Sequence, residues 1–195
     1  MVTITRIIRQ ISAPLRGVLA VAFALTFSLL PIAGIVPAQA SGDGVSALHT
    51  MKPLDRTTPN TIITQADGTE SAFDTLTGRP MLVNFWASWC APCVHELPDL
   101  VVLDQALSDV GMGVMLVGLD RKGNIFGENF LNDKNIVVSS RVYDPSGDLP
   151  RILDIKVMPT SFLITADGRM IGRIDGPLDW AAPDVIAAVT AALTP

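Results

Sequence analysis

Residues 80–93 read PMLVNFWASWCAPC and contain both cysteines of this 195-residue chain. Up to its serine, the stretch is almost continuously apolar and rich in β-branched and aromatic residues, which is typical of a strand buried on both faces of a sheet. Apolar residues then recur at helical spacing from Ala91 to Ser108, which predicts an amphipathic helix with a kink at Pro98. Cys90 and Cys93 therefore lie where a buried strand ends and a helix begins.

Strand and helix patterns alternate along the rest of the sequence. Two Asp-Gly pairs, at 67–68 and 167–168, each separate short apolar segments and predict β-hairpins. Strands are predicted at 61–64, 71–73, 80–87, 113–119, 136–142, 160–165 and 169–174, and helices at 91–108, 124–135, 149–155 and 179–193. Strands that alternate with helices form parallel pairs through right-handed crossovers, and a closing hairpin adds antiparallel strands. The predicted fold class is therefore α/β, a sandwich with one central mixed β-sheet flanked by helices and a short N-terminal β-hairpin.

The composition excludes several classes of protein. The chain is 49% hydrophobic and long enough to bury a core without a structural metal or a disulfide framework. Two cysteines cannot complete a four-cysteine zinc site, and we expect no metal and no other cofactor. The net charge of −5 argues against a nucleic-acid partner, because nucleic-acid-binding domains carry a basic surface.

The first 40 residues carry the pattern of an export signal. Arg6, Arg9 and Arg16 precede an uncharged apolar run from Gly17 to Leu30, and the small-x-small site Ala38-Gln39-Ala40 follows. A basic segment, an apolar segment and such a site are together typical of a secretory signal peptide. The sequence contains no twin-arginine pair there, which favours the general export route.

An uncleaved membrane anchor is the alternative interpretation of the same segment. Residues 17–36 are long enough to cross a bilayer, although Pro31 would interrupt the helix. In both cases the rest of the chain lies outside the cytoplasm, so we expect a periplasmic location in the cell envelope. The predicted organisation is a signal or anchor at 1–40, a linker at 41–60 and one folded domain at 61–195. Without its first 40 residues the chain keeps eleven basic and 19 acidic residues, a net charge of −8.

The position of the two cysteines favours redox chemistry. The first N–H groups of a helix are unpaired and the helix dipole is positive there, so a thiolate at Cys90 is stabilised. Cys93 lies one turn deeper on the same face of the predicted helix. Cys90 can then attack the disulfide of a partner, and Cys93 can resolve the mixed disulfide that results.

Three other interpretations of the cysteine pair remain open. A structural disulfide would close a loop of only four residues and would stabilise the fold little. A metal site would need His49, in the predicted linker, or His95, on the predicted helix, as further ligands. Two inert buried thiols would share this spacing by coincidence. Redox activity is favoured, because a Cys-x-x-Cys pair near a βαβ pattern is typical of redox proteins.

The stretch 82–93, LVNFWASWCAPC, resembles the active-site strand and motif of the thioredoxin superfamily. Residues 157–160, VMPT, resemble the loop of that superfamily that carries a cis proline. The longer pattern VNFWASWCAPCVHELP at 83–98, together with GPLDWA at 176–181, is closer to the TlpA-like thiol:disulfide oxidoreductases, a group that includes ResA and CcmG. The resemblance covers about residues 70–190 and implies a thioredoxin-like sandwich.

The resemblance assigns roles to residues around the redox-active disulfide that the cysteines would form. It implies that Pro159 is cis and lies beside Cys90. It also implies that Met158 exposes backbone groups to which a substrate peptide can add as a strand. Trp89 and Thr160 would belong to the same substrate-binding surface. Without the resemblance, a trans peptide bond is the expectation for the proline.

The resemblance also singles out two polar residues in apolar surroundings. Asn84 occupies the strand position at which ordinary thioredoxins have a buried Asp, and Glu96 follows Cys93 by three residues as in the TlpA-like pattern. A buried Glu96 with a raised pKa would accept or return the Cys93 proton. A solvated glutamate near a helix N-terminus is the alternative. His95 departs from the basic residue usual in relatives, and Trp86 is expected in the core.

The export signal, the cysteine pair and the resemblance together predict an exported protein-disulfide reductase. Its partners would be disulfide-containing proteins, namely apo-cytochromes or copper-site assembly proteins of respiratory oxidases. A membrane thiol reductase would supply the electrons, because the compartment is oxidising. The alternatives are a periplasmic thiol oxidant of the DsbA type, which would carry a helical insertion, and a copper-binding assembly chaperone without turnover, which would space its cysteines by three residues and use a distal histidine.

Overall fold

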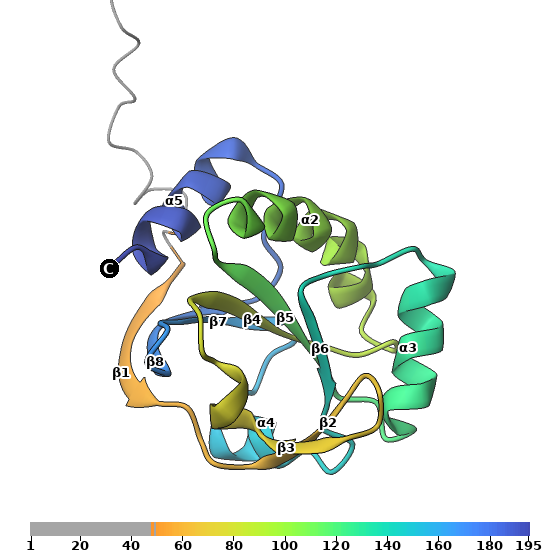
Figure 1. Cartoon of the computed structure of the whole chain (residues 1–195). Coiled ribbons are helices and arrows are strands. Elements are labelled where there is room, and N and C mark those ends of the chain that lie inside the picture. Colours follow the sequence, from red (N-terminus) through yellow and green to blue (C-terminus); the bar gives the residue numbers. More distant parts are fainter. Residues whose placement is uncertain (1–47, 49) are drawn as a thin grey trace, which may run out of the picture. The chain divides into compact units, whose positions relative to one another are not determined.

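The computed structural model describes Leu48 and residues 50–195 (Figure 1). The predicted signal or anchor at 1–40 lies outside the described residues, as does His49. None of the helices in the described part is both long enough and apolar enough to cross a membrane.

The centre of the fold is one eight-stranded sheet. Its strands are β1 (Lys52–Thr57), β2 (Ile62–Gln65), β3 (Glu70–Ala72), β4 (Met81–Trp86), β5 (Gly113–Gly118), β6 (Ser140–Tyr143), β7 (Thr160–Ile164) and β8 (Arg169–Asp175). They lie in the order β1-β8-β7-β4-β5-β6-β2-β3. β4, β5 and β6 run parallel, and the other neighbouring pairs are antiparallel. The mixed central sheet and the thioredoxin-like α/β fold expected from the sequence are thus confirmed.

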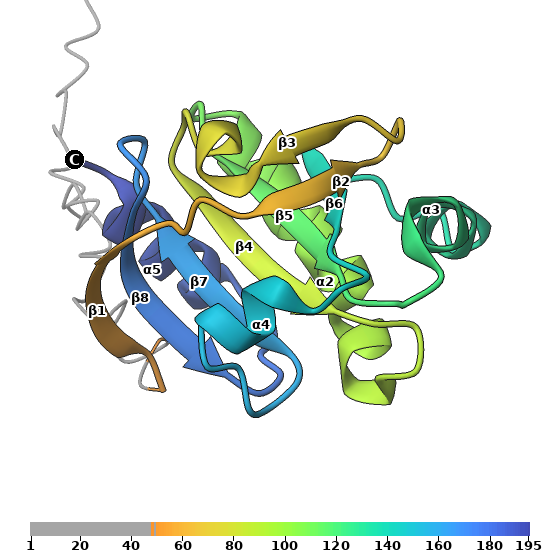
Figure 2. The same ribbon diagram turned by 90° about the horizontal axis from the view of Figure 1, so that it is seen from below.

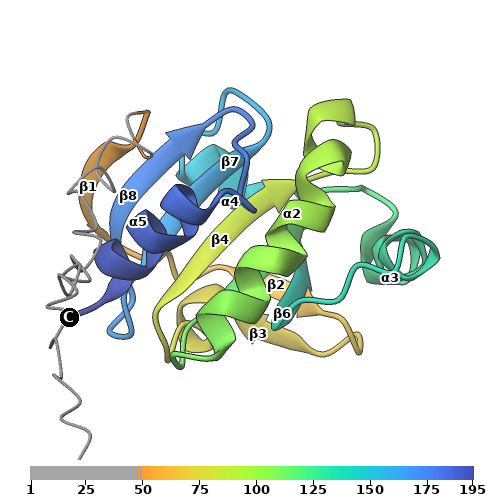
Figure 3. The ribbon, with the colours of Figure 1, turned by 90° about the horizontal axis from the view of Figure 1, so that it is seen from above.

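Helices cover both faces of this sheet. α2 (Ala91–Ser108) and α5 (Pro183–Leu193) lie on one face (Figure 3), and the short α4 (Asp148–Ile152) lies on the other (Figure 2). α3 (Gly123–Asp133) packs beside β5 and β6, and the 3₁₀ turn η1 (Phe73–Leu76) adds Phe73 to the core on the face of α4. The sheet therefore separates two hydrophobic cores.

The central strand β4 belongs to both cores. Leu82 and Trp86 pack into the core beneath α2 and α5, whereas Val83 and Phe85 pack into the other one. This is the alternation expected of a strand, and all six of its residues are buried, which confirms the prediction that Trp86 is a core residue. Asn84 is the polar exception within β4, and it shares the α2 face with Leu82 and Trp86.

β1 forms inside the stretch that the sequence indicates as a linker. It pairs with β8 at the edge of the sheet, and five of its six residues are exposed. A strand that buries almost no side chain shows no alternation of apolar and polar residues. The sequence KPLDRT therefore carries no strand signal, although its backbone completes the sheet.

Two further boundaries differ from the predicted ones. β6 begins at Ser140 rather than at residue 136, because Ile136 belongs to the turn that ends α3, two residues after its C-cap Lys134. Asn135 has a φ of 56°, and the next N–H, from Ile136, bonds to the carbonyl of Leu131 at 2.9 Å. This is a helix C-cap that places an apolar residue against the last turn. α5 begins at Pro183, after a turn, and not at residue 179.

Candidate active site

The two cysteines form a disulfide at the N-terminus of α2. Cys90 is the N-cap residue of the helix, and its backbone N–H bonds to the carbonyl of Ala87, the first residue of the turn that follows β4. The sulfur atoms of Cys90 and Cys93 are 2.09 Å apart. The backbone N–H of Cys93 also points at the Cys90 sulfur, with 3.3 Å between nitrogen and sulfur. The first turn of α2 thus directs a hydrogen-bond donor and the positive end of its dipole at Cys90.

The two cysteines differ in their access to solvent. Cys90 is 6% exposed, whereas Cys93 is completely buried. Trp89, the residue before Cys90, is 69% exposed and stands on the surface beside it. A partner that approaches this end of α2 therefore meets Cys90 and Trp89 first.

The loop before β7 lies at the same edge of the sheet. Thr160 pairs with Phe85 across the antiparallel β4–β7 ladder, so the residues before it lie level with the end of β4, from which the chain leads to Cys90. The peptide bond between Met158 and Pro159 is cis, as the resemblance implies. Met158 is partly buried and packs against both hydrophobic cores.

Thr160 is the first residue of β7, directly after this loop, and its side chain is not on the surface. Its side chain is completely buried, and its hydroxyl donates to the carbonyl oxygen of Val157 at 2.7 Å. Val157 itself is half exposed and was not singled out in the sequence. The side chain that the loop presents to a partner is therefore that of Val157, and the Thr160 hydroxyl holds the loop together.

Glu96 is buried one turn below the cysteines. It is only 2% exposed, and its carboxylate accepts three hydrogen bonds. Oε1 accepts from Nδ2 of Asn84 at 2.7 Å, and Oε2 accepts from Nε1 of Trp180 at 3.1 Å and from the backbone N–H of Leu178 at 3.4 Å. The three donors come from β4 and from the loop before α5, so the carboxylate ties three parts of the fold together.

Burial raises the pKa of Glu96 from its usual 4.5 to about 7. The hydrogen bonds from Asn84, Trp180 and Leu178 act in the opposite direction, because they stabilise the charged form, and the nearby charge of Asp99 adds to the rise. The loss of hydration raises the pKa by more than the three hydrogen bonds lower it. The carboxyl can therefore gain or lose a proton near neutral pH.

Asn84 connects this carboxylate to β7. Its Nδ2 atom also lies 3.0 Å from Oγ of Ser161, while its Oδ1 atom has no hydrogen-bond partner among the described residues. The sequence indicated Asn84 and Glu96 separately but not their contact. Trp180 and Ser161 received no role from the sequence, although a buried tryptophan N–H generally requires an acceptor.

His95 lies on the rim of a hollow of about 420 Å³ that reaches Glu96. Asp99 and Asp179 line the same hollow, which opens to solvent on the side of α2 nearest the loop before α5. This hollow offers a route by which protons can pass between solvent and the buried carboxyl. Within residues 48 and 50–195, no group of three or more His, Cys, Asp or Glu side chains is placed to hold a metal ion.

Thiol:disulfide oxidoreductases of the thioredoxin fold carry their redox pair at the start of the helix that follows the central strand, and this chain is of that class. The family model Redoxin matches residues 53–189, and the chain belongs to that family. These two observations confirm an enzyme that exchanges dithiols and disulfides through Cys90 and Cys93.

Individual relatives agree with this assignment. The chain is 27% identical over 123 residues to the thiol-disulfide oxidoreductase ResA of Bacillus thuringiensis, and the match covers 63% of this chain and 70% of the relative. It is 33% identical over 115 residues to the thiol:disulfide interchange protein HelX of Rhodobacter capsulatus, and the match covers 57% of this chain and 62% of the relative. A crystal structure of a thiol:disulfide interchange protein from Chlorobium tepidum is similar over 73% of this chain and 99% of its own, with 26% identity and a TM-score of 0.58. The chain is thus a TlpA/ResA/CcmG-like thiol:disulfide oxidoreductase, as the resemblance implies.

Proposed function

We propose that this protein is an exported reductase of protein disulfides in which Cys90 attacks, Cys93 resolves and Glu96 carries the proton of Cys93. The observation that carries the proposal is the unequal burial of the pair. Cys90, at the start of α2, keeps 6% of its surface exposed, whereas Cys93 is completely buried, one turn above a carboxyl with a pKa of about 7.

The reaction has two exchange steps. In the first, the thiolate of reduced Cys90 attacks one sulfur of the partner's disulfide, and the other partner sulfur leaves as a thiolate. In the second, the Cys93 thiolate attacks the Cys90 sulfur, which closes the Cys90–Cys93 disulfide and releases the second partner thiolate. Two electrons pass to the partner, and the two protons lost by the cysteines balance those taken up by the two partner thiolates.

Glu96 acts as the base in the second step. A completely buried thiol ionises poorly in apolar surroundings, so Cys93 needs a nearby base. Residues three apart on a helix share a face, which places Glu96 beneath Cys93. A protonated Glu96 supplies an O–H donor, and rotation of the Asn84 amide would turn its unpartnered Oδ1 towards that donor. The proton then passes from Glu96 to solvent through the hollow that His95 lines.

The substrate contact is proposed at Trp89 and at the loop from Val157 to Thr160. Trp89 and Val157 are exposed, and the β4–β7 register sets the loop level with the end of β4. Backbone groups of Met158, before Pro159, are available to an extended segment of the partner that adds as a strand. Thr160 contributes by holding this loop in shape.

The direction and setting of the reaction are part of the proposal. The basic, apolar and small-residue pattern of the first 40 residues supports export to the periplasm, where a reductase must draw electrons from a membrane thiol reductase. The resemblance to TlpA-like proteins supports partners in respiratory cytochrome or oxidase biogenesis, namely apo-cytochromes or copper-site assembly proteins.

Trapping tests the roles of the two cysteines. Cys93→Ser is expected to accumulate a mixed disulfide with the partner through Cys90, and the matched variant Cys90→Ser is expected to accumulate none. In Cys93→Ser, alkylation of Cys90 by iodoacetamide is expected to be half-maximal below the pH of about 8.5 that is usual for a free thiol. Partners that are trapped by Cys90→Ser instead would reverse the assignment.

The reduction potential tests the direction. A reductase is expected to have a potential well below about −120 mV, the value of the strong oxidant DsbA. A potential at or above that value would make the protein an oxidant. Identification of the trapped partner by mass spectrometry tests the proposed targets in the same preparation.

A further inference from the structure

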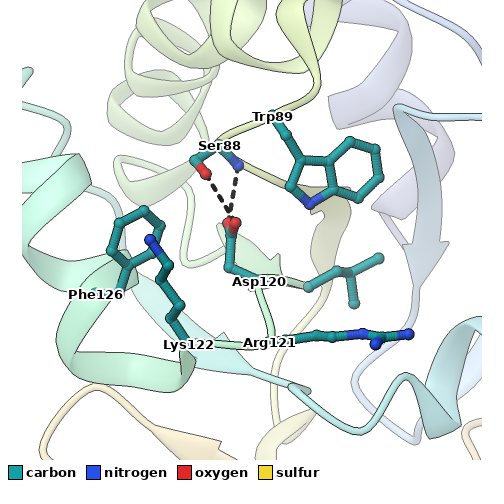
Figure 4. Close-up of a pocket in the computed structure, with 7 residues that line it drawn as sticks. Ser88, Trp89, Asp120, Arg121, Lys122 and Phe126 are labelled. Carbon is teal, nitrogen blue, oxygen red and sulfur yellow. Dashed lines mark hydrogen bonds between the residues drawn. The ribbon is translucent and has the colours of Figure 1, made fainter.

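A hollow of about 500 Å³ is lined in part by Ser88 and Trp89, the two residues that precede Cys90 (Figure 4). The residues that matter for its chemistry are Ser88, Trp89, Asp120, Arg121, Lys122 and Phe126. They come from the turn that leads to Cys90, from the segment after β5 and from the first turn of α3. Because Ser88 and Trp89 directly precede Cys90 in the chain, the hollow belongs to the surface around the start of α2.

Asp120 fixes the shape of the hollow. Its carboxylate is 6% exposed and accepts hydrogen bonds from the backbone N–H of Ser88 at 2.8 Å and from the Ser88 hydroxyl at 2.7 Å. In the view of Figure 4, Trp89 and Arg121 lie on one side of this pair, and Lys122 and Phe126 lie on the other. The acidic group of the hollow is therefore buried and already hydrogen-bonded, and it braces the turn before Cys90.

The basic side chains face solvent instead. Arg121 and Lys122 are exposed, and neither forms an ion pair with another residue of the described part of the chain. The Lys122 ammonium lies 4.5 Å from the centre of the Phe126 ring, a cation–π contact that holds it at the edge of the hollow. The surface thus presents two exposed positive charges without an ion-pair partner among the described residues, in the same hollow as the exposed indole of Trp89.

This basic and aromatic surface contrasts with its surroundings. Asp99 and Asp179 line the hollow that reaches Glu96. From residue 41 onwards the chain has 19 acidic residues against eleven basic ones. The hollow that Trp89 lines therefore carries two adjacent cations, whereas the hollow that reaches Glu96 carries two carboxylates.

We propose that the surface formed by Trp89, Arg121 and Lys122 binds an acidic segment next to the target disulfide of the substrate protein. The inference rests on the proposed reduction of partner disulfides and specifies which disulfides are favoured. Arg121 and Lys122 attract carboxylates as the partner approaches, since charges at the rim of an interface act mainly on the association rate. Trp89 packs against an apolar side chain beside the partner's cysteine, because an exposed tryptophan is a typical interface anchor.

Three synthetic peptides with the same intramolecular disulfide provide the test. One carries two Glu beside a cysteine, one carries two Gln and one carries two Lys. The full-length wild-type protein is expected to reduce the Glu peptide roughly tenfold faster than the Gln peptide at low ionic strength, and the Lys peptide more slowly than either. In about 1 M NaCl, where the Debye length is about 3 Å, the three rates are expected to converge.

The double variant Arg121→Glu with Lys122→Glu is expected to reverse this preference, so that the Lys peptide becomes the fastest. The matched control, Arg56→Glu with Lys134→Glu, makes the same change in net charge at exposed positions on β1 and at the end of α3. It is expected to keep the wild-type order of the three rates.

Equal wild-type rates for the three peptides would overturn the inference while leaving the reductase proposal intact. Failure of the wild-type protein to reduce any of them would overturn the reductase proposal itself. Binding of the wild-type protein, but not of the double variant, to phosphatidylglycerol vesicles, together with equal peptide rates, would assign the surface to an anionic membrane and refute an acidic protein partner.

Discussion

Replacement of Glu96 by Gln should change how the stability of the oxidised protein depends on pH. The folded protein binds the Glu96 proton more tightly than the unfolded chain does, because burial raises the pKa from 4.5 to about 7. This contribution to stability is complete below the unfolded pKa, declines as the pH rises and is lost above the folded pKa. A shift of this size corresponds to about 3 kcal/mol, since one pKa unit is about 1.4 kcal/mol. The side chain is buried, so screening by solvent reduces the value little.

The glutamine side chain of this variant would carry no charge at any pH. It can still accept from Asn84, but its NH₂ group would face the N–H of Trp180, which costs about 1 kcal/mol. The Glu96→Gln protein is therefore expected to be less stable than the wild type by about 1 kcal/mol near pH 4 and more stable by about 2 kcal/mol near pH 8. The two stability curves should cross between these values.

Urea denaturation of the disulfide-bonded proteins at intervals from pH 4 to pH 8 measures this difference. Keeping the disulfide closed prevents the cysteines from titrating. The matched control is Glu70→Gln, the same substitution at an exposed position of β3, and it is expected to follow the wild type throughout. Parallel curves for the wild type and Glu96→Gln would show that folding leaves the pKa of the carboxyl unchanged and would refute the reasoning.

Two other substitutions probe the surroundings of the site. Trp180→Phe removes a donor that lowers the folded-state pKa of Glu96, which is the upper end of the pH range over which stability declines. This upper end should lie roughly 0.7 of a pH unit higher in the variant than in the wild type, measured by the same urea series, and an unchanged upper end would contradict the hydrogen bond. Gly127→Ala would bring a methyl group into the Tyr143 ring and should cost about 1–3 kcal/mol of unfolding free energy. Gly78→Ala is its control, because no atom lies within 4 Å of a methyl group there, and equal stabilities of the two variants would refute the predicted clash.

Local signals explain why most of the fold could be predicted. The helix predicted at 91–108 has these bounds in the structure, because its apolar spacing and the Pro-Cys first turn lie within one continuous segment. The hairpin turns at Asp67-Gly68 and Asp167-Gly168 were also predictable, since both glycines have positive φ, near 90° and 80°. β1 could not be found in this way, because its pairing partner β8 determines it and its own side chains are mostly exposed.

The active site was predictable in part for the same reason. Cys90, Cys93 and Glu96 lie on one helix, so their relative placement follows from helical spacing. Trp180 is 84 residues away from Glu96 in the sequence, and only the tertiary fold brings its N–H to the carboxylate. A local sequence pattern does not indicate contacts over such separations, so the influence of Trp180 on the pKa of Glu96 is visible only in the structure.

The buried carboxylates of this fold differ in the donors that bind them, and this difference distinguishes a structural role from a chemical one. Asp104 accepts from the backbone N–H groups of Val114 and Ser139 at 2.7 and 2.8 Å. Asp144 likewise accepts from the backbone N–H of Leu149 at 2.7 Å and from those of the two residues before it. Such donors belong to the backbone and are fixed in place by the fold. Glu96 relies on two side-chain donors and one long backbone contact of 3.4 Å, and burial outweighs them. A buried carboxyl with a pKa of about 7 stabilises the fold less at neutral pH. In the proposed mechanism this cost has a purpose, because a group that gains and loses a proton near neutral pH is suited to ionise a buried thiol.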